Sequence, residues 1–234
     1  MRKHPLFWLP NALTIIRCGL GVAVAMIIVA IAQKEASLIS VVQDVSLGPQ
    51  MRMVHQDMIA DYRMFWGGVA FVIFVIAAVS DFLDGFLARR WRIESTLGRL
   101  LDPIADKITV GLPLLAIAAV SGWSLPLAAP AIAIVFRDVF ITVLRFAGLG
   151  ASRMAVSMAA KTKTFLEMIV IALFLVLLAL VKPTSALFAG FATIWIVLLW
   201  VTALLSVYTG LQYLLGLMRP APPEPQPQTT EIQR

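Results

Sequence analysis

Long apolar stretches, separated by short polar segments, run along most of the chain. Residues 64–80, 108–136 and 183–218 contain no Asp, Glu, Lys or Arg. A helix needs about 20 apolar residues to cross a bilayer, and these stretches lack the alternation of a membrane β-strand. Because a helix satisfies its backbone hydrogen bonds within the segment, the pattern predicts an all-α, polytopic membrane protein.

Turn signals and charged residues divide the apolar stretches into six predicted transmembrane helices. The central stretch breaks at Ser121, Gly122 and Trp123, ahead of Pro126, which is typical of a tight turn with an interfacial indole. The predicted spans cover residues 11–32, 63–88, 98–120, 125–148, 159–181 and 185–210.

Two segments lie outside these spans. Residues 33–62 are predicted to form one long polar loop, whose apolar residues from Met51 to Phe65 recur at helical spacing and suggest an amphipathic lead-in to the second span. Prolines dominate residues 219–234, where no apolar face exists to bury. We therefore expect a transmembrane domain over residues 1–218 and a disordered, Pro-rich cytoplasmic tail over residues 219–234.

Composition narrows the class of protein further. Hydrophobic residues make up 60% of the chain and charged residues 14%, against about 25% charged in soluble domains, which excludes an ordinary soluble enzyme. The single cysteine, Cys18, cannot form an internal disulfide. The net charge of +6 fits positive loops at a membrane surface and contact with anionic lipids. Basic residues interleaved with aromatic ones are not seen outside the spans, so no nucleic-acid partner is expected.

The distribution of basic residues predicts the orientation. They gather before the first span and after the second, fourth and sixth, as Arg2, Lys3, Arg17, Arg89, Arg90, Arg92, Arg153, Lys161, Lys163 and Arg219. Cytoplasmic loops carry such an excess, so both termini should be cytoplasmic. The N-terminal segment resembles a cleavable signal peptide, but Arg17 interrupts its apolar run, and we expect no cleavage.

Candidate chemistry lies where the second span should end. Asp81 and Asp84 share one face of a helix, and Asp102 and Asp106, four residues apart, share a face of the next. Four carboxylates so close together repel one another unless a cation is present. Because oxygen donors favour hard ions, Mg²⁺ is the first expectation, with Mn²⁺ or Ca²⁺ as alternatives.

The spacing of these residues is specific. The pattern is Asp81, two residues, Asp84-Gly85, two residues, Ala88-Arg89, eight residues, Gly98, three residues, Asp102, three residues, Asp106. It resembles the signature of the CDP-alcohol phosphatidyltransferases. The resemblance implies six transmembrane helices, a homodimer and a CDP-linked lipid substrate.

The resemblance also implies roles for individual residues. Asp81, Asp84, Asp102 and Asp106 would bind metal, and Asp106 would also be the general base, kept ionised by the metals and by Lys107. The residues expected near the CDP group of the donor are Gly85, Ala88, Arg89, Asn11, Thr14 and Arg17. For Arg17, extension of the side chain toward water is an equal alternative. An acceptor hydroxyl would attack the lipid-side phosphorus of CDP-diacylglycerol and release CMP, with the active site on the cytoplasmic side of a bacterial inner membrane.

The acceptor is a separate question. Four segments are similar to family members that use glycerol 3-phosphate, namely 10–17, 101–107, 137–138 together with 144–145, and 161–164. Those members more often have Glu, Gly and Gln where this chain has Asp138, Ala160 and Glu167. Cations inside apolar runs need an anionic partner, so we expect the acceptor phosphate to contact Arg137, Arg145, Lys161 and Lys163. For the two lysines, anchoring at the cytoplasmic face is a nearly equal alternative.

Other functions stay open at this point. A cardiolipin synthase of the same family would accept phosphatidylglycerol instead, and inositol phosphate and serine are further acceptors. A small transporter is the alternative from a different class, because intramembrane charges also mark ion pathways. A pathway would distribute its polar residues over several depths, whereas the acidic set gathers at one membrane face.

Overall fold

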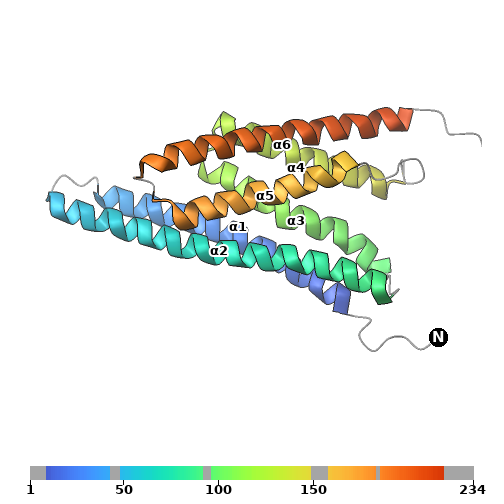
Figure 1. Ribbon diagram of the computed structural model, residues 1–234, viewed down its shortest axis with the longest axis horizontal. Helices are drawn as coiled ribbons and strands as arrows, with labels where there is room; N and C mark the ends of the chain where they lie inside the picture. The colour runs from blue at the N-terminus through green and yellow to red at the C-terminus, as the bar shows by residue number, and fades with distance from the viewer. Residues whose placement is uncertain (1–8, 43–47, 92–95, 149–157, 183–184, 219–234) are drawn as a thin grey trace, which may run out of the picture.

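The computed structural model describes residues 9–42, 48–91, 96–148, 158–182 and 185–218, and within these ranges it describes no side chains for residues 9–10, 41–42, 82, 84–91, 96–100 and 158–161. The described part is all-α (Figure 1). Its helices are α1 (Leu9–Val42), α2 (Pro49–Trp91), α3 (Thr96–Val120), α4 (Leu125–Phe146), α5 (Met158–Leu180) and α6 (Ala186–Met218). All six are long and apolar enough to cross a membrane, which confirms the predicted fold class. The predicted tail, 219–234, lies outside the described residues.

Helices α1 and α2 are much longer than the predicted spans. The prediction of a long polar loop over residues 33–62 is wrong for most of its length, because α1 continues to Val42 and α2 begins at Pro49. The amphipathic lead-in is indeed helical, and it is continuous with the second span. At 1.5 Å per residue, α2 is about 65 Å long, roughly twice the apolar thickness of a bilayer.

A half-buried ion pair joins the two extended helices at the end of the bundle where α1 finishes. Arg63 of α2 is 7% exposed, and its Nε lies 3.8 Å from the carboxylate of Glu35 in α1. The guanidinium of Arg63 also lies over the ring of Phe188, 5.0 Å from its centroid, at the start of α6. These contacts link α1, α2 and α6 at this end.

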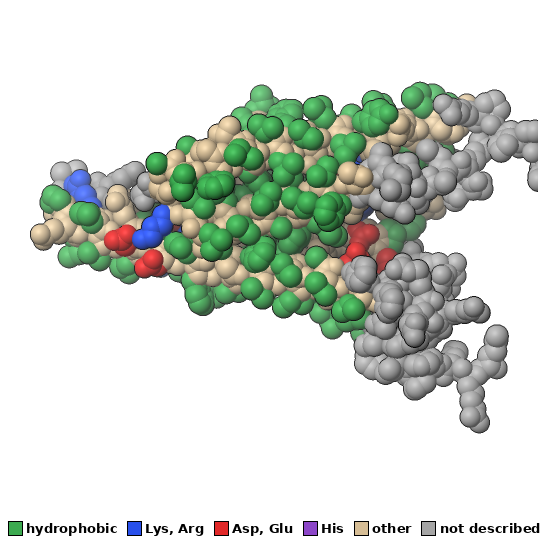
Figure 2. All heavy atoms as spheres, viewed as in Figure 1, with side chains coloured by type: hydrophobic (Ala, Val, Ile, Leu, Met, Phe, Trp, Pro, Cys, Tyr) green, Lys and Arg blue, Asp and Glu red, His purple; other side chains and the backbone are tan. Residues whose placement is uncertain are grey.

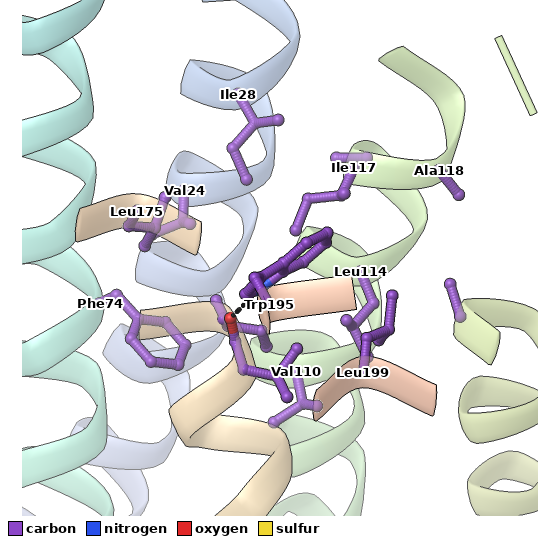
Figure 3. Close-up of a cluster of buried hydrophobic side chains, with 14 of the residues drawn as sticks. Val24, Ile28, Phe74, Val110, Leu114, Ile117, Ala118, Leu175, Trp195 and Leu199 are labelled. Atoms are coloured by element: carbon purple, nitrogen blue, oxygen red, sulfur yellow. Dashed lines mark hydrogen bonds between the residues drawn. The ribbon is translucent and has the colours of Figure 1, made fainter. Parts of the chain in front are cut away.

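The six helices form a closed ring of neighbours. Going round it, α1 packs on α2, α2 on α5, α5 on α6, α6 on α4, α4 on α3 and α3 on α1, while α3 and α5 also touch across the middle. The central core is apolar (Figure 3). Trp195 of α6 reaches into it beside Leu114 and Leu199, and its indole N–H donates to the carbonyl of Val170 in α5 at 2.7 Å.

Local sequence explains the tight connection between α3 and α4. Gly122 has a φ of +65°, and its N–H donates to the carbonyl of Ala119, while the N–H of Trp123 donates to that of Ala118. This is the Schellman pattern, in which a residue without a β-carbon ends a helix by adopting the left-handed conformation. The predicted turn is therefore present.

A contact from α6 compensates for a proline inside α4. Pro130 has no N–H, so the carbonyl of Pro126, four residues earlier, lacks its usual helical donor. The indole N–H of Trp200 in α6 donates to that carbonyl at 3.0 Å. Because α6 supplies this donor, α4 and α6 are fixed against each other near the start of α4.

The alternating direction of the helices brings six helix ends to one side of the bundle. Helices α1, α3 and α5 begin there, and α2, α4 and α6 end there (Figure 1). Hydrophobic side chains cover the middle of the face in Figure 2, and acidic ones appear toward both ends. Residues near 17, 81, 102, 138 and 163 therefore meet at the end where α1 begins, and they form the site described below.

Candidate active site

Three aspartates of the sequence pattern surround one buried arginine. Arg17 of α1 is 1% exposed and forms an ion pair with Asp81 at the end of α2. Its two terminal nitrogens also lie 3.9 Å from Asp102 and 3.4 Å from Asp106, both on α3. The predicted convergence of Asp81, Asp102 and Asp106 is therefore present, and Arg17 points inward to them and not toward water.

A close crossing of α1 and α3 holds Arg17 in this position. A β-carbon added at Gly21, one turn after Arg17, would lie 2.7 Å from the Cα of Thr109 in α3. Only glycine lets the two backbones approach so closely. Thr14, one turn before Arg17, is 1% exposed, and its hydroxyl donates to the carboxylate of Asp102 at 3.0 Å.

Other predicted donor-site residues are placed only by their backbone. Asp84, Gly85, Ala88 and Arg89 belong to α2, but their side chains lie outside the described part of the structure. Asn11 lies half-buried in the first turn of α1, on the same helix as Thr14 and Arg17.

A second charged cluster surrounds Asp138 of α4. Its carboxylate accepts hydrogen bonds from Arg137 at 3.0 Å, from Lys107 of α3 at 3.2 Å and from Lys163 of α5. Lys163 is 2% exposed and also pairs with the buried Glu167, one turn further along α5, at 2.8 Å. We call Lys107, Arg137, Asp138, Lys163 and Glu167 the Asp138 cluster.

Helix α6 contacts both of the predicted acceptor-site arginines. The Nη2 atom of Arg137 donates to the hydroxyl oxygen of Thr209 at 3.0 Å. Arg145 is exposed, and its guanidinium lies 5.6 Å from the ring centroid of Tyr213. The side chain of Lys161, the remaining predicted residue, is not among the described ones, although its backbone belongs to α5.

One pocket connects the two groups of charges. Its volume is about 60 Å³, and its polar lining includes Arg17, Asp81, Asp106, Lys107, Asp138 and Glu167. Thr109 also lines it, is 2% exposed, and its hydroxyl has no hydrogen-bond partner in the described part of the chain. A ligand in this pocket would meet Asp81 and Asp106 beside Arg17 on one side, and Lys107, Asp138 and Glu167 on the other.

Sequence reasoning did not assign Asp138, Glu167 or Thr109 to the site. Asp138 and Glu167 interrupt the apolar runs of α4 and α5, and ionisable residues in such runs mark functional sites in membrane proteins. That signal would have found both carboxylates. The amine of Lys107 pairs with Asp138, and the ion pair of Asp106 is with Arg17.

The donor chemistry of the acidic group fits a hard divalent cation. Carboxylate oxygens are the ligands that Mg²⁺ and Mn²⁺ take, and one guanidinium does not neutralise three carboxylates. Among the described side chains, no three acidic, His or Cys residues are arranged to hold a metal ion. This does not apply to Asp84, because its side chain is not among the described ones. A metal site of Asp81, Asp84, Asp102 and Asp106 therefore stays a prediction that the donor set supports.

Comparison with known proteins identifies the family of the chain. The model of the CDP-alcohol phosphatidyltransferase family matches residues 7–208, so the chain belongs to that family. A protein of Cereibacter sphaeroides named CDP-diacylglycerol–glycerol-3-phosphate 3-phosphatidyltransferase is 47% identical over 105 residues, a match that covers 44% of this chain and 48% of the relative.

Two further relatives carry the same name and match over a longer stretch. The protein of Sodalis glossinidius is 38% identical, and that of Rickettsia bellii is 32% identical. Each match covers 61% of this chain and 75% of the relative. The predicted family is thus confirmed, and the names of the relatives agree with the predicted acceptor.

Proposed function

We propose that the protein is a membrane transferase that moves a phosphatidyl group from CDP-diacylglycerol to glycerol 3-phosphate and releases CMP. The observation that carries the proposal is the pocket lined both by the motif aspartates Asp81 and Asp106 and by Lys107, which pairs with Asp138. The names of the relatives in C. sphaeroides, S. glossinidius and R. bellii support the same pair of substrates.

The acidic side of the pocket would take the donor. Asp81, Asp84 and Asp102 would hold Mg²⁺ or Mn²⁺, and Asp106 would be a further ligand. A divalent cation bound there would offset the charge of the pyrophosphate and of the departing CMP. Arg17 and Thr14 already contact these aspartates from α1, so they orient the carboxylates. Gly85, Ala88, Arg89 and Asn11 would adjoin the nucleotide.

The cationic side would take the acceptor phosphate. Arg137 and Lys163 both pair with Asp138, which lines the pocket, and both have further N–H donors for an anion. Arg145 and Lys161 would extend this surface. Asp138 pairs with both cations and Glu167 pairs with Lys163, and these ion pairs fix the positions of the cations.

The proposed reaction exchanges one phosphorus–oxygen bond for another. The hydroxyl oxygen of glycerol 3-phosphate forms a bond to the lipid-side phosphorus, and the bond from that phosphorus to the bridging oxygen breaks. CMP leaves with the electron pair. The hydroxyl proton passes to the carboxylate of Asp106, which lines the pocket, as expected of a general base.

The alternatives differ in acceptor or in class. A transporter is not favoured, because an apolar core that includes Phe74, Leu114 and Leu175 fills the centre of the bundle between its two polar ends. A cardiolipin synthase would need a pocket suited to a second lipid, whereas the Asp138 cluster offers cations for a small anionic acceptor.

A product analysis with an acceptor panel tests the proposal. Purified protein in nanodiscs receives CDP-diacylglycerol with glycerol 3-phosphate, phosphatidylglycerol, inositol phosphate or serine, and CMP and the lipid product are quantified. We expect turnover with glycerol 3-phosphate. Arg137→Ala should raise the KM for glycerol 3-phosphate far more than that for CDP-diacylglycerol, whereas Asp106→Asn should lower kcat with little change in either KM. Turnover with another acceptor alone would refute the assignment.

A further inference from the structure

Helix α6 carries a narrow polar face, to which the signature motif and the predicted site residues assign no role. Most of its exposed surface is apolar, yet Thr202, Ser206, Thr209 and Tyr213 recur three or four residues apart and are all buried. The last turns of this face lie against α4, at the end of the bundle that holds the pocket. Thr209 and Gly210 fall just beyond residue 208, where the family match ends.

The hydroxyl of Thr209 is arranged as an acceptor for Arg137. It donates its own hydrogen to the carbonyl of Ser206 at 2.9 Å, which fixes the position of the oxygen. The Nη2 atom of Arg137 donates to that oxygen at 3.0 Å, while Nη1 donates to Asp138. Each terminal nitrogen has a second hydrogen, so the anchored guanidinium keeps donors for an anion.

Gly210 provides the space in which the stem of Arg137 lies. A β-carbon added at Gly210 would be 2.9 Å from Cγ of Arg137 and 3.3 Å from its Nε. Both separations are shorter than normal contact, so an alanine there would push the arginine away from α6. The stem of Arg137 thus lies in the space left by Gly210, and its tip is held by Thr209 and Asp138.

We infer that Thr209 and Gly210 are positioning residues that set the affinity of the enzyme for its anionic acceptor, by fixing the guanidinium of Arg137 beside Asp138. This inference rests on the proposed function, because it takes Arg137 to bind the phosphate of glycerol 3-phosphate. Neither residue needs to touch substrate. Their effect should therefore appear in the acceptor KM, the same parameter that Arg137→Ala changes.

The test compares variants of α6 with matched controls in the same helix. Thr209→Val removes the hydroxyl at nearly constant volume, and Thr202→Val is its control, because Thr202 is fully buried and donates to the carbonyl of Leu198 within α6. Gly210→Ala is compared with Gly190→Ala, since no described atom lies within 4 Å of a β-carbon added at Gly190. Thr209→Ser restores the hydroxyl. Steady-state kinetics for both substrates and thermal unfolding are measured for each variant.

We expect Thr209→Val to raise the KM for glycerol 3-phosphate about tenfold, as the loss of a hydrogen bond to a charged group would, with the KM for CDP-diacylglycerol within about twofold of wild type. Gly210→Ala should act in the same direction. Thr209→Ser, Thr202→Val and Gly190→Ala should stay within about twofold of wild type for both substrates.

Two outcomes overturn the inference. The first is a Thr209→Val enzyme whose KM for glycerol 3-phosphate equals that of the wild type. If the wild-type enzyme uses glycerol 3-phosphate, this result refutes the inference and leaves the proposed function standing. The second is an equal rise in both KM values with lowered thermal stability, which would show a merely structural role. A wild-type enzyme that does not use glycerol 3-phosphate refutes the proposed function itself, and the acceptor panel shows this before any variant is made.

Discussion

Arg17 occupies a position where a buried guanidinium would be costly without partners. It is 1% exposed and lies among Asp81, Asp102 and Asp106, so each charge has an opposite charge nearby. The spacing of the aspartates in the sequence was enough to predict that they converge, because residues four apart share a helix face. It did not predict that an arginine from α1 would lie among them.

The first prediction concerns the aspartates. Asp81→Asn and Asp102→Asn should each lower turnover by about 100-fold or more, because each removes a proposed metal ligand at constant size. Asp57→Asn is the control, since Asp57 is exposed on α2 at the other end of the bundle. Activity should disappear with a chelator and return with Mg²⁺ or Mn²⁺. Near-normal turnover in either site variant would exclude that residue from the metal site.

The partners of Asp138 could not be predicted from the sequence for a physical reason. Lys107 is 31 residues away in sequence and Lys163 is 25 residues away, and each belongs to a different helix. No local spacing relates them. Only the packing of α3, α4 and α5 brings these two lysines to the carboxylate that Arg137 already adjoins in the sequence.

A second prediction follows for this carboxylate. Asp138→Asn should raise the KM for glycerol 3-phosphate and lower the melting temperature, because three cations lose their shared counter-charge in a poorly solvated place. Steady-state kinetics and thermal unfolding in detergent measure both effects. If the variant keeps the wild-type KM, the cluster does not position the acceptor site.

At the scale of elements, the existence and order of the six helices followed from the apolar runs, whereas the lengths of α1 and α2 did not. The extensions of these two helices carry polar residues, and this polarity led to the prediction of a loop. One contact between elements lies beside these extensions, the pairing of Glu35 with Arg63, together with the packing of Phe188 on Arg63. Its members are far apart in the sequence, so no local pattern predicts it.

The third prediction tests the crossing of α1 and α3. Gly21→Ala should lower the free energy of unfolding by about 1–3 kcal/mol and reduce activity, because the new methyl group would meet the backbone of Thr109 and displace Arg17. Gly19→Ala is the matched control, since no described atom lies within 4 Å of a β-carbon added there. Thermal unfolding and turnover are measured for both. Equal behaviour of the two variants would mean that the crossing does not hold the site together.

At the scale of the whole molecule, an even number of antiparallel spans brings the start of α1 and the end of α6 to the same end of the bundle. The charged residues of the pocket lie at that end as well, and the apolar core separates them from the pair of Glu35 and Arg63.

A fourth prediction, which rests on the family resemblance, is that the protein is a homodimer. Native mass spectrometry from nanodiscs or mild detergent should give twice the mass of the chain, which is 25.6 kDa. A preparation that is active and contains monomer alone would contradict this.

The last prediction concerns which membrane face holds the site. The basic residues in the loops predict that the end of the bundle with the pocket is cytoplasmic. In a Cys18→Ser background, Ala147→Cys marks this end, because Ala147 is exposed just after α4, and Asp57→Cys marks the other. A membrane-impermeant maleimide should label Asp57→Cys in intact spheroplasts and Ala147→Cys only after the membrane is opened. Labelling of Ala147→Cys in sealed spheroplasts would place the pocket on the outer face of the membrane. The pocket would then be separated from a cytoplasmic supply of glycerol 3-phosphate and CDP-diacylglycerol, which would contradict the proposed function.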